Sequence, residues 1–137
     1  MKTLIIGLGN PILGDDGIGW RVAEEIAKRF SSPFSPLPAR EEGTIEVDTA
    51  ALGGLSLMEQ LIGYDYVILI DSLNTGQHPQ GAVVTFTLDS LDDLSYGHSA
   101  SAHDVSLKTA LRMGRQMGID LPDDADVHVV AVEAQHV

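Results

Sequence analysis

The chain has 137 residues, of which 44% are hydrophobic and 20% charged, as in one globular domain with its own core. Its formal net charge of −12 argues against a nucleic-acid partner, because the phosphates would be repelled, and the lack of cysteine excludes disulfides, thiolate metal sites and a cysteine nucleophile. No apolar run approaches the roughly 20 residues that span a bilayer, so we expect a single cytoplasmic domain over residues 1–137 that binds no membrane.

The first predicted strand runs into a glycine-rich turn that carries Asp15 and Asp16 to the start of a helix. A dinucleotide-binding turn has glycine at its first, third and sixth positions. Gly7 and Gly9 supply two of these, but the sixth position is Ile12. Free N–H groups and the helix dipole would bind a phosphate at the helix start, and two carboxylates occupy that place here. The motif therefore indicates a cation or a helix cap rather than a nucleotide.

Strand and helix patterns alternate along the rest of the chain, which predicts a three-layer α/β/α fold. The predicted strands are Thr3–Ile6, Thr44–Val47, Tyr66–Ile70, Val83–Leu88 and Val127–Val132. Helices are predicted from Ile18 to Phe30, from Leu55 to Ile62 and from Asp104 to Met117. The sheet is expected to be twisted and mostly parallel with about five strands, Val83–Leu88 being a candidate antiparallel edge strand. A further helix is expected after the last strand, and it is missing from this sequence.

Carboxylates and one amide follow three of the predicted strands. Asn10 and Asp16 follow the first strand, Asp48 follows the second, and Asp71 directly follows Tyr66–Ile70. Ligands bind beyond the carboxyl ends of the strands in open parallel sheets. Each aspartate alone could be a turn residue or a helix cap. Together at one edge they would repel one another, which predicts that a positive group binds among them.

One of the five histidines is well placed to join these carboxylates. Ser101 and Asp104 can form a capping-box variant, which would place His103 in the first turn of the third helix. His128 falls in an apolar strand, where a core or edge histidine is expected, and His78 lies in a turn. Two or three oxygen ligands with one imidazole suit nickel, zinc, manganese or iron.

Four motifs in this order resemble those of the nickel–iron hydrogenase maturation proteases. They are Gly7-Leu-Gly-Asn-Pro-Ile-Leu-Gly-Asp-Asp-Gly-Ile-Gly19, Gly53-Gly54-Leu55 ahead of a helix, the apolar strand ending in Asp71, and Ser101-Ala-His103. The resemblance covers nearly the whole chain and implies a three-layer α/β metal-dependent endopeptidase. Such an enzyme removes the carboxyl-terminal extension of the hydrogenase large-subunit precursor after nickel insertion.

The resemblance also implies roles for individual residues. Asp16, Asp71 and His103 would recognise the nickel that the substrate carries, and other divalent ions could occupy the same place. These three residues would therefore act catalytically through the metal. Substrate recognition would fall on Asn10, Asp48, Gly53 and Gly54, although the turn after Asp48 is looser here than the family pattern.

Two alternative interpretations remain at this point. Peptidyl-tRNA hydrolases also begin with a strand and Gly-Leu-Gly-Asn-Pro, but they require a Thr-Arg-His-Asn segment where this chain has Asp15-Asp-Gly-Ile18. Their RNA substrate also calls for a basic face rather than a charge of −12. The other alternative is a binding module that checks nickel loading without cutting.

Overall fold

The computed structural model contains a five-stranded sheet with the strand order β2-β1-β3-β5-β4. The strands are β1 (Lys2–Leu8), β2 (Thr44–Ala50), β3 (Tyr66–Leu73), β4 (Val83–Thr87) and β5 (Val127–Glu133). The pairs β1–β2, β1–β3 and β3–β5 are parallel, and β4 pairs with β5 antiparallel. The structure describes residues 1–9, 17–31, 44–51, 54–73, 78–92 and 102–133, with the backbone alone at 30–31, 54, 73, 91–92 and 102–105.

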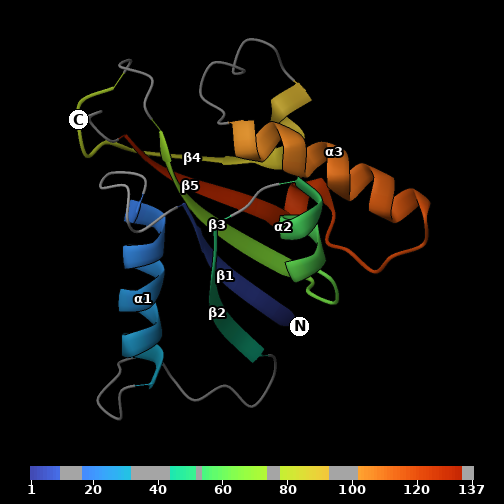
Figure 1. Ribbon diagram of the computed structural model, residues 1–137, viewed down its shortest axis with the longest axis horizontal. Helices are drawn as coiled ribbons and strands as arrows, with labels where there is room; N and C mark the ends of the chain where they lie inside the picture. Colours follow the sequence, from blue (N-terminus) through green and yellow to red (C-terminus); the bar gives the residue numbers. More distant parts are fainter. Residues whose placement is uncertain (10–16, 32–43, 52–53, 74–77, 93–101, 134–137) are drawn as a thin grey trace.

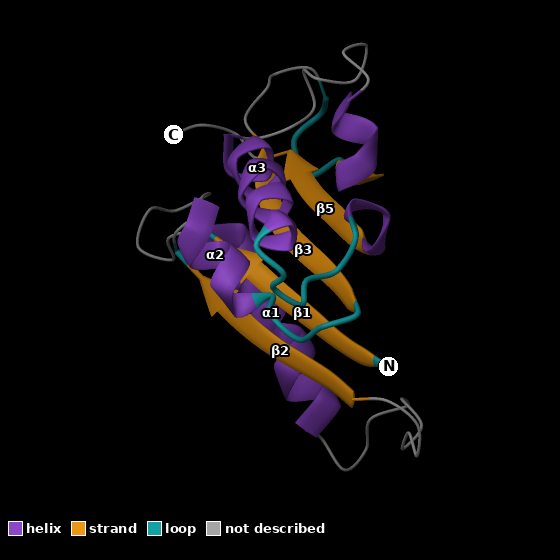
Figure 2. Ribbon diagram, turned by 90° about the vertical axis from the view of Figure 1, so that its right-hand side faces the viewer, coloured by secondary structure: helices purple, strands orange, loops and turns teal. Residues whose placement is uncertain are grey.

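Helices cover both faces of this sheet. Helix α1 (Ile18–Ser31) lies on one face, whereas α2 (Gly54–Gln60) and α3 (Ala102–Gln116) pack together on the other (Figures 1 and 2). The predicted three-layer α/β/α arrangement, with a mostly parallel sheet and one antiparallel edge strand, is confirmed. Since α3 leads into β5 through 117–126, its first turn points toward the edge where the parallel strands end (Figure 1).

The main hydrophobic core lies between the sheet and the α2–α3 pair. Side chains along β5 alternate between buried and half-buried, as expected when one face is better covered than the other. The fully buried residues of this core include Leu4, Ile6, Leu57, Leu61, Val67, Leu69, Leu107, Leu111, Val127 and Val129. This face of the sheet also continues into the candidate site, because Asp71 follows Val67 and Leu69 in the same alternation.

Strands β1, β3 and β5 end one to three residues later than predicted, so that Asp71 lies inside β3 rather than after it. The ends of β2 and β4 also differ from the prediction. Strand β2 continues to Ala50, so Asp48 lies inside the strand rather than after it, opposite Ile6 of β1. Strand β4 ends at Thr87, and Leu88–Asp92 form a short 3-10 helix, η2. The reason is packing: Leu88 is fully buried, and its carbonyl oxygen accepts a hydrogen bond from Lys108 on α3 rather than from a neighbouring strand.

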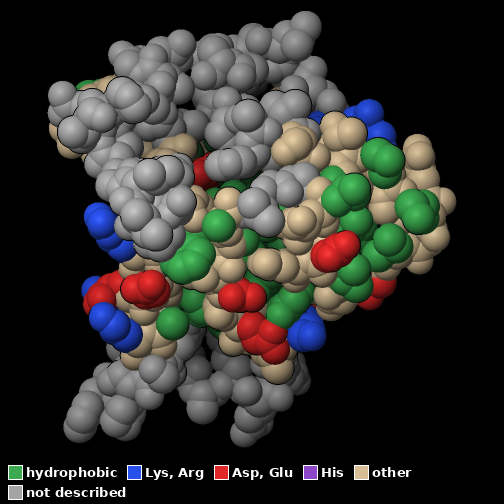
Figure 3. Space-filling model, in the orientation of Figure 1, with side chains coloured by type: hydrophobic (Ala, Val, Ile, Leu, Met, Phe, Trp, Pro, Cys, Tyr) green, Lys and Arg blue, Asp and Glu red, His purple; other side chains and the backbone are tan. Residues whose placement is uncertain are grey.

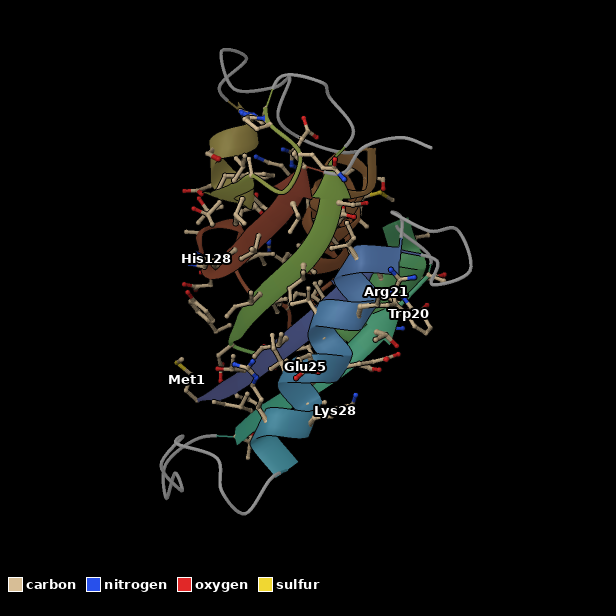
Figure 4. All side chains as sticks on the ribbon, turned by 90° about the vertical axis from the view of Figure 1, so that its left-hand side faces the viewer. Met1, Trp20, Arg21, Glu25, Lys28 and His128 are labelled. Carbon is tan, nitrogen blue, oxygen red and sulfur yellow. The ribbon has the colours of Figure 1, made fainter. Side chains whose placement is uncertain are left out.

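Some apolar surface stays exposed around this fold. Met113 of α3 is 51% exposed and Met117, directly after the helix, is 76% exposed. Hydrophobic side chains gather over α3 on the face seen in Figure 3. His128 of β5 lies on the face of the sheet opposite to α3, away from α1 (Figure 4), and the centre of its ring is 4.9 Å from that of the Tyr66 ring.

Within the described residues, no helix has the length and apolarity needed to cross a membrane.

The edge where the strands begin carries a tyrosine with a shifted pKa. The Tyr64 hydroxyl donates a hydrogen bond to the Glu46 carboxylate, and the Lys2 ammonium lies 4.7 Å from the Tyr64 ring centroid. The hydrogen bond to Glu46, with a smaller effect of burial, raises the pKa of Tyr64 to about 12. Because this pKa is raised, the stability that the bond contributes is present below pH 10 and is lost as the pH rises through 12.

We expect Glu46→Gln to lower the pKa of Tyr64 toward its ordinary value of about 10, because the carboxylate charge is removed. Ultraviolet absorbance of tyrosinate during an alkaline titration measures this change, and Tyr64→Phe identifies the relevant step. A wild-type Tyr64 that titrates near pH 10 would contradict the assignment.

Candidate functional site

Asp71 is a buried carboxylate near the end of the central strand. It is 1% exposed, and its Oδ1 accepts a hydrogen bond of 2.8 Å from the Ser72 backbone N–H. Strand β3 continues for two residues beyond it, and Asp71 lies opposite Ala131 of β5. Ionised carboxylates are buried only when they are paired, hydrogen-bonded or bound to a metal. This position is therefore suited to binding a cation or a proton donor.

One backbone carbonyl, that of Ala50 at the end of β2, holds the two ends of the segment that links β1 to α1. The Gly9 backbone N–H donates to this oxygen at 3.0 Å, and the Trp20 indole Nε1–H donates to it at 3.1 Å. Gly9 has a φ of 126°, a conformation that favours glycine. The chain therefore leaves β1 and enters α1 beside the same atom, at the edge where Asp71 lies.

Two glycines let α1 approach the sheet at this edge. A Cβ on Gly19 would lie far inside van der Waals contact with the carbonyl oxygens of Leu8 and Ile70. A Cβ on Gly7 would clash in the same way with the Gly19 backbone and would lie 2.8 Å from the Ala23 Cβ. The first turn of α1 thus rests directly on the backbone of β1 and β3, one residue before Asp71.

Helix α3 is held by a partly buried network of charges. Lys108, which is 6% exposed, donates to the Leu88 carbonyl at 2.9 Å and lies 3.8 Å from an Asp124 carboxylate oxygen. The Arg115 guanidinium bonds the other Asp124 oxygen and the Pro122 carbonyl, both at 2.7 Å. These contacts attach α3 to η2 and to the 3-10 helix η4 (Asp124–Asp126). They fix the helix whose first turn contains His103.

The structure describes some of the predicted site residues and not others. Asp71 is described in full, and the backbone of His103 lies in the first turn of α3 as expected. Asn10, Asp16 and Gly53 lie outside the described residues. No group of three or more histidine, aspartate or glutamate side chains that could hold a metal occurs within the described part of the chain.

The remaining two predicted recognition residues lie elsewhere than expected. Asp48 is exposed on the edge strand β2, where its carboxylate accepts a 2.8 Å hydrogen bond from the Thr49 N–H, so it is a strand residue and not a loop residue. Gly54 is the first residue of α2 rather than a residue ahead of the helix.

Sequence reasoning missed two residues of this edge. Glu133 is 3% exposed at the end of β5, directly after an apolar strand, and the rule that selected Asp71 would have found it. Trp20 carries no local signal of its role, because its partner, the Ala50 carbonyl, is 30 residues away.

Comparisons with known proteins agree with this geometry. A family model described as hydrogenase maturation protease matches residues 20–135. The chain is 23% identical over 118 residues to the hydrogenase 2 maturation protease of Escherichia coli, covering 86% of this chain and 66% of that protein. It is 36% identical over 93 residues to the protein HydD of Wolinella succinogenes, covering 66% and 57%.

A solution structure of an endopeptidase from Escherichia coli has the same fold, with a TM-score of 0.67 at 23% identity. The match covers 97% of this chain and 74% of that one. The chain thus spans roughly three fifths to three quarters of the length of these proteins.

We expect Gly19→Ala to destabilise the protein by about 1–3 kcal/mol or more, because the added methyl group must push α1 away from the sheet backbone. Chemical denaturation measures the loss. Gly114→Ala in α3 is a matched control: its Cβ would lie 2.6 Å from the end of the flexible Leu121 side chain, which can move. Equal losses of unfolding free energy in the two variants would contradict the prediction that the contact of Gly19 with the sheet backbone leaves no room for a side chain.

Proposed function

We propose, because this chain belongs to the hydrogenase maturation protease family, that it is an endopeptidase that removes the carboxyl-terminal extension of a hydrogenase large-subunit precursor. In this proposal, the enzyme works in the cytoplasm after nickel has been inserted into the precursor. Asp16, Asp71 and His103 bind the nickel that the substrate carries, so metal insertion itself permits cleavage.

The observation that carries this proposal is the buried carboxylate of Asp71. It lies at the carboxyl edge of the central strand, between the ends of β1 and β5, where ligands bind in parallel sheets. Leu8 and Ala131, its neighbours on the same face of β1 and β5, are buried and apolar. A charged oxygen in such surroundings binds a cation strongly, because little water competes for it.

The anchoring of α1 supports a role for Asp16 beside Asp71. Asp16 precedes Gly19 by three residues, so covalent geometry confines it within about 11 Å of that glycine. Gly19 in turn lies against the carbonyl of Ile70, the residue before Asp71. Chain length and the contact between glycine and sheet thus support the proposed pairing of Asp16 with Asp71.

The orientation of α3 supports the third ligand. His103 belongs to the first turn of this helix, which points toward the carboxyl edge of the sheet. The Lys108 and Arg115 contacts with Asp124 keep the helix in that orientation. Two carboxylates and an imidazole form a donor set that suits nickel.

Binding the substrate's nickel would fix the scissile peptide bond relative to the enzyme. Positioning of this kind can supply a large part of a rate enhancement, since the reacting groups no longer search for each other. A metal ion at this place can polarise the scissile carbonyl or lower the pKa of a bound water to about 7. A carboxylate such as Asp16 can accept the proton of the attacking water.

We expect cleavage to depend on nickel in the substrate. A nickel-loaded large-subunit precursor should be shortened by the enzyme, whereas the same precursor without metal should stay intact. Gel electrophoresis of both precursors after incubation measures the difference. Equal cleavage of the metal-free precursor would remove nickel sensing from the proposal, and binding without cleavage would favour the non-cleaving module.

We expect the three proposed ligands to differ in how well they tolerate substitution. Asp71→Ala and His103→Ala should abolish processing, whereas Asp16→Glu should retain more activity than Asp16→Asn, because only glutamate keeps the charge. Processing rates on the nickel-loaded precursor measure this order, and circular dichroism verifies folding. Glu25→Gln, on the exposed face of α1, is the control for a lost acidic residue. A fully active His103→Ala enzyme would exclude the proposed site.

A further inference from the structure

Within the described residues, the sheet ends in two edge strands that differ in charge. Strand β2 is the last strand on one side, and β4 is the last on the other, next to β5 (Figure 1). An edge strand presents backbone N–H and C=O groups to which a further strand can bind, and proteins commonly protect it with charges or proline. Strand β2 carries the exposed carboxylates of Glu46 and Asp48, whereas β4 reads Val-Val-Thr-Phe-Thr, without charge or proline.

The hydrogen bonds at the start of β4 show which of its backbone groups point away from β5. The Gly81 N–H donates to the Glu133 carbonyl at 2.7 Å, and the Glu133 N–H donates to the Ala82 carbonyl at 2.8 Å. With Gly81 at a φ of +87°, this is a β-bulge in which two residues of one strand oppose one of the other. Backbone groups point alternately to the two sides of an antiparallel strand, and those of Ala82 point to β5. The residues whose N–H and C=O groups point away from β5 are therefore Val83, Thr85 and Thr87.

This outer side of β4 is accessible to a second strand. Val83 is 59% exposed, and Thr85 is exposed as well. Within the described residues, the outward N–H and C=O groups of these two residues form no hydrogen bond. The Thr87 carbonyl accepts a 2.6 Å hydrogen bond from the Ser90 hydroxyl, so the strand ends there and a second strand can pair over residues 83–87.

The sequence of β4 is complementary to itself. When two copies of the strand run antiparallel about a two-fold axis at Thr85, Val83 lies opposite Thr87 of the second copy, and the two Thr85 residues lie opposite each other. Outward backbone groups then meet outward backbone groups. On the other face of the strand, Val84 lies opposite Phe86 of the second copy. Threonine pairs and pairs of an aromatic with a β-branched residue both stabilise antiparallel strands.

Strand β2 is not complementary to itself. The Thr44 N–H donates to the Met1 carbonyl, so the outward groups of β2 belong to the odd-numbered residues. Antiparallel self-pairing about Val47 would place Glu46 opposite Asp48 of the second copy, and would do so twice. Like charges directly opposite each other destabilise a strand pair. Of the two edges, β4 is therefore the one that fits a second copy of this chain.

We infer that two copies of this chain pair through β4, antiparallel about Thr85, so that their two five-stranded sheets form one continuous sheet. The two-fold axis reverses the strand direction, so the Asp71 edges of the two copies lie at opposite ends of the joint sheet. Pairing through β4 covers neither of these edges. The inference therefore goes beyond the proposed function and does not depend on it.

Charge sets how the association should respond to salt. Each copy has a net charge of −12, so the two copies repel each other at long range. Added salt screens this repulsion, because the Debye length falls to about 10 Å at 0.1 M. The strand pair itself contains no charge. We therefore expect the dimer to become tighter as the salt concentration rises.

The test is sedimentation equilibrium of the full chain over a series of protein concentrations. The wild type should show a concentration-dependent dimer. Thr85→Lys should raise the dissociation constant at least about tenfold, because two like charges then lie opposite each other. Thr85→Glu should do the same, and an equimolar mixture of the two variants should recover the dimer, since lysine then lies opposite glutamate. Thr85→Pro should also prevent pairing, because it removes an outward N–H and leaves the bonds to β5 in place.

The matched control is Thr44→Lys, which makes the same change of charge at an exposed position of β2 and should dimerise like the wild type. Circular dichroism verifies that each variant is folded. A wild type that stays monomeric at every concentration would overturn the inference. Equal weakening by Thr44→Lys, or a mixture of Thr85→Lys and Thr85→Glu that stays monomeric, would overturn it as well, because the contact would then not lie at Thr85.

Processing of the nickel-loaded precursor separates this inference from the proposed function. Folded Thr85→Lys should cleave the precursor at the wild-type rate, because the pairing covers neither Asp71 edge. A dimeric wild type that does not cut would refute the peptidase activity alone. A monomeric wild type whose KM for the precursor rises in Thr85→Pro would show that the edge of β4 binds the substrate, and would refute the pairing of two copies.

Discussion

The structure depends on one close contact, between the backbone of Gly19 at the start of α1 and the carbonyl oxygens of Leu8 and Ile70. No side chain fits between helix and sheet at that point. The contact brings the chain back onto the sheet right after it leaves β1, and the shared Ala50 carbonyl holds the same two places from the side of β2. Both ends of the linking segment are therefore fixed at the carboxyl edge of the sheet, the edge at which Asp71 is buried.

The α2–α3 face of the sheet carries two buried carboxylates as well as the main hydrophobic core. On the α2–α3 face, the alternation that buries Val67 and Leu69 also buries Asp71, and the alternation that buries Val129 and Ala131 also buries Glu133. The hydrophobic core thus ends in two carboxylates on adjacent strands. Burial restricts their rotamers and excludes water, which strengthens any interaction with a cation or a hydrogen-bond donor.

The sequence predicted the layers because they depend on periodicity and strand order, and it predicted the place of Asp71 because carboxyl ends of parallel strands share an edge. It failed where a residue's state depends on a distant partner. Lys108 resembles a surface lysine of an amphipathic helix, yet the Leu88 carbonyl and Asp124 bury it. Asp48 resembles a turn residue, but pairing with β1 extends β2 past it. Long-range hydrogen bonds of this kind leave no local pattern.

The two edges of the sheet are held by contacts of different strength, which suits the metal site that we propose at the carboxyl edge. Metal–ligand distances vary by only about 0.2 Å, so the elements that carry the proposed ligands need fixed backbones. At the carboxyl edge, buried contacts provide this: Gly19 on the sheet, Lys108 on α3 and Glu133 on the turn before β4. At the amino edge, exposed hydrogen bonds such as that from the Lys2 backbone N–H to the Asp65 carboxylate suffice, because competition from water there has no consequence for the site.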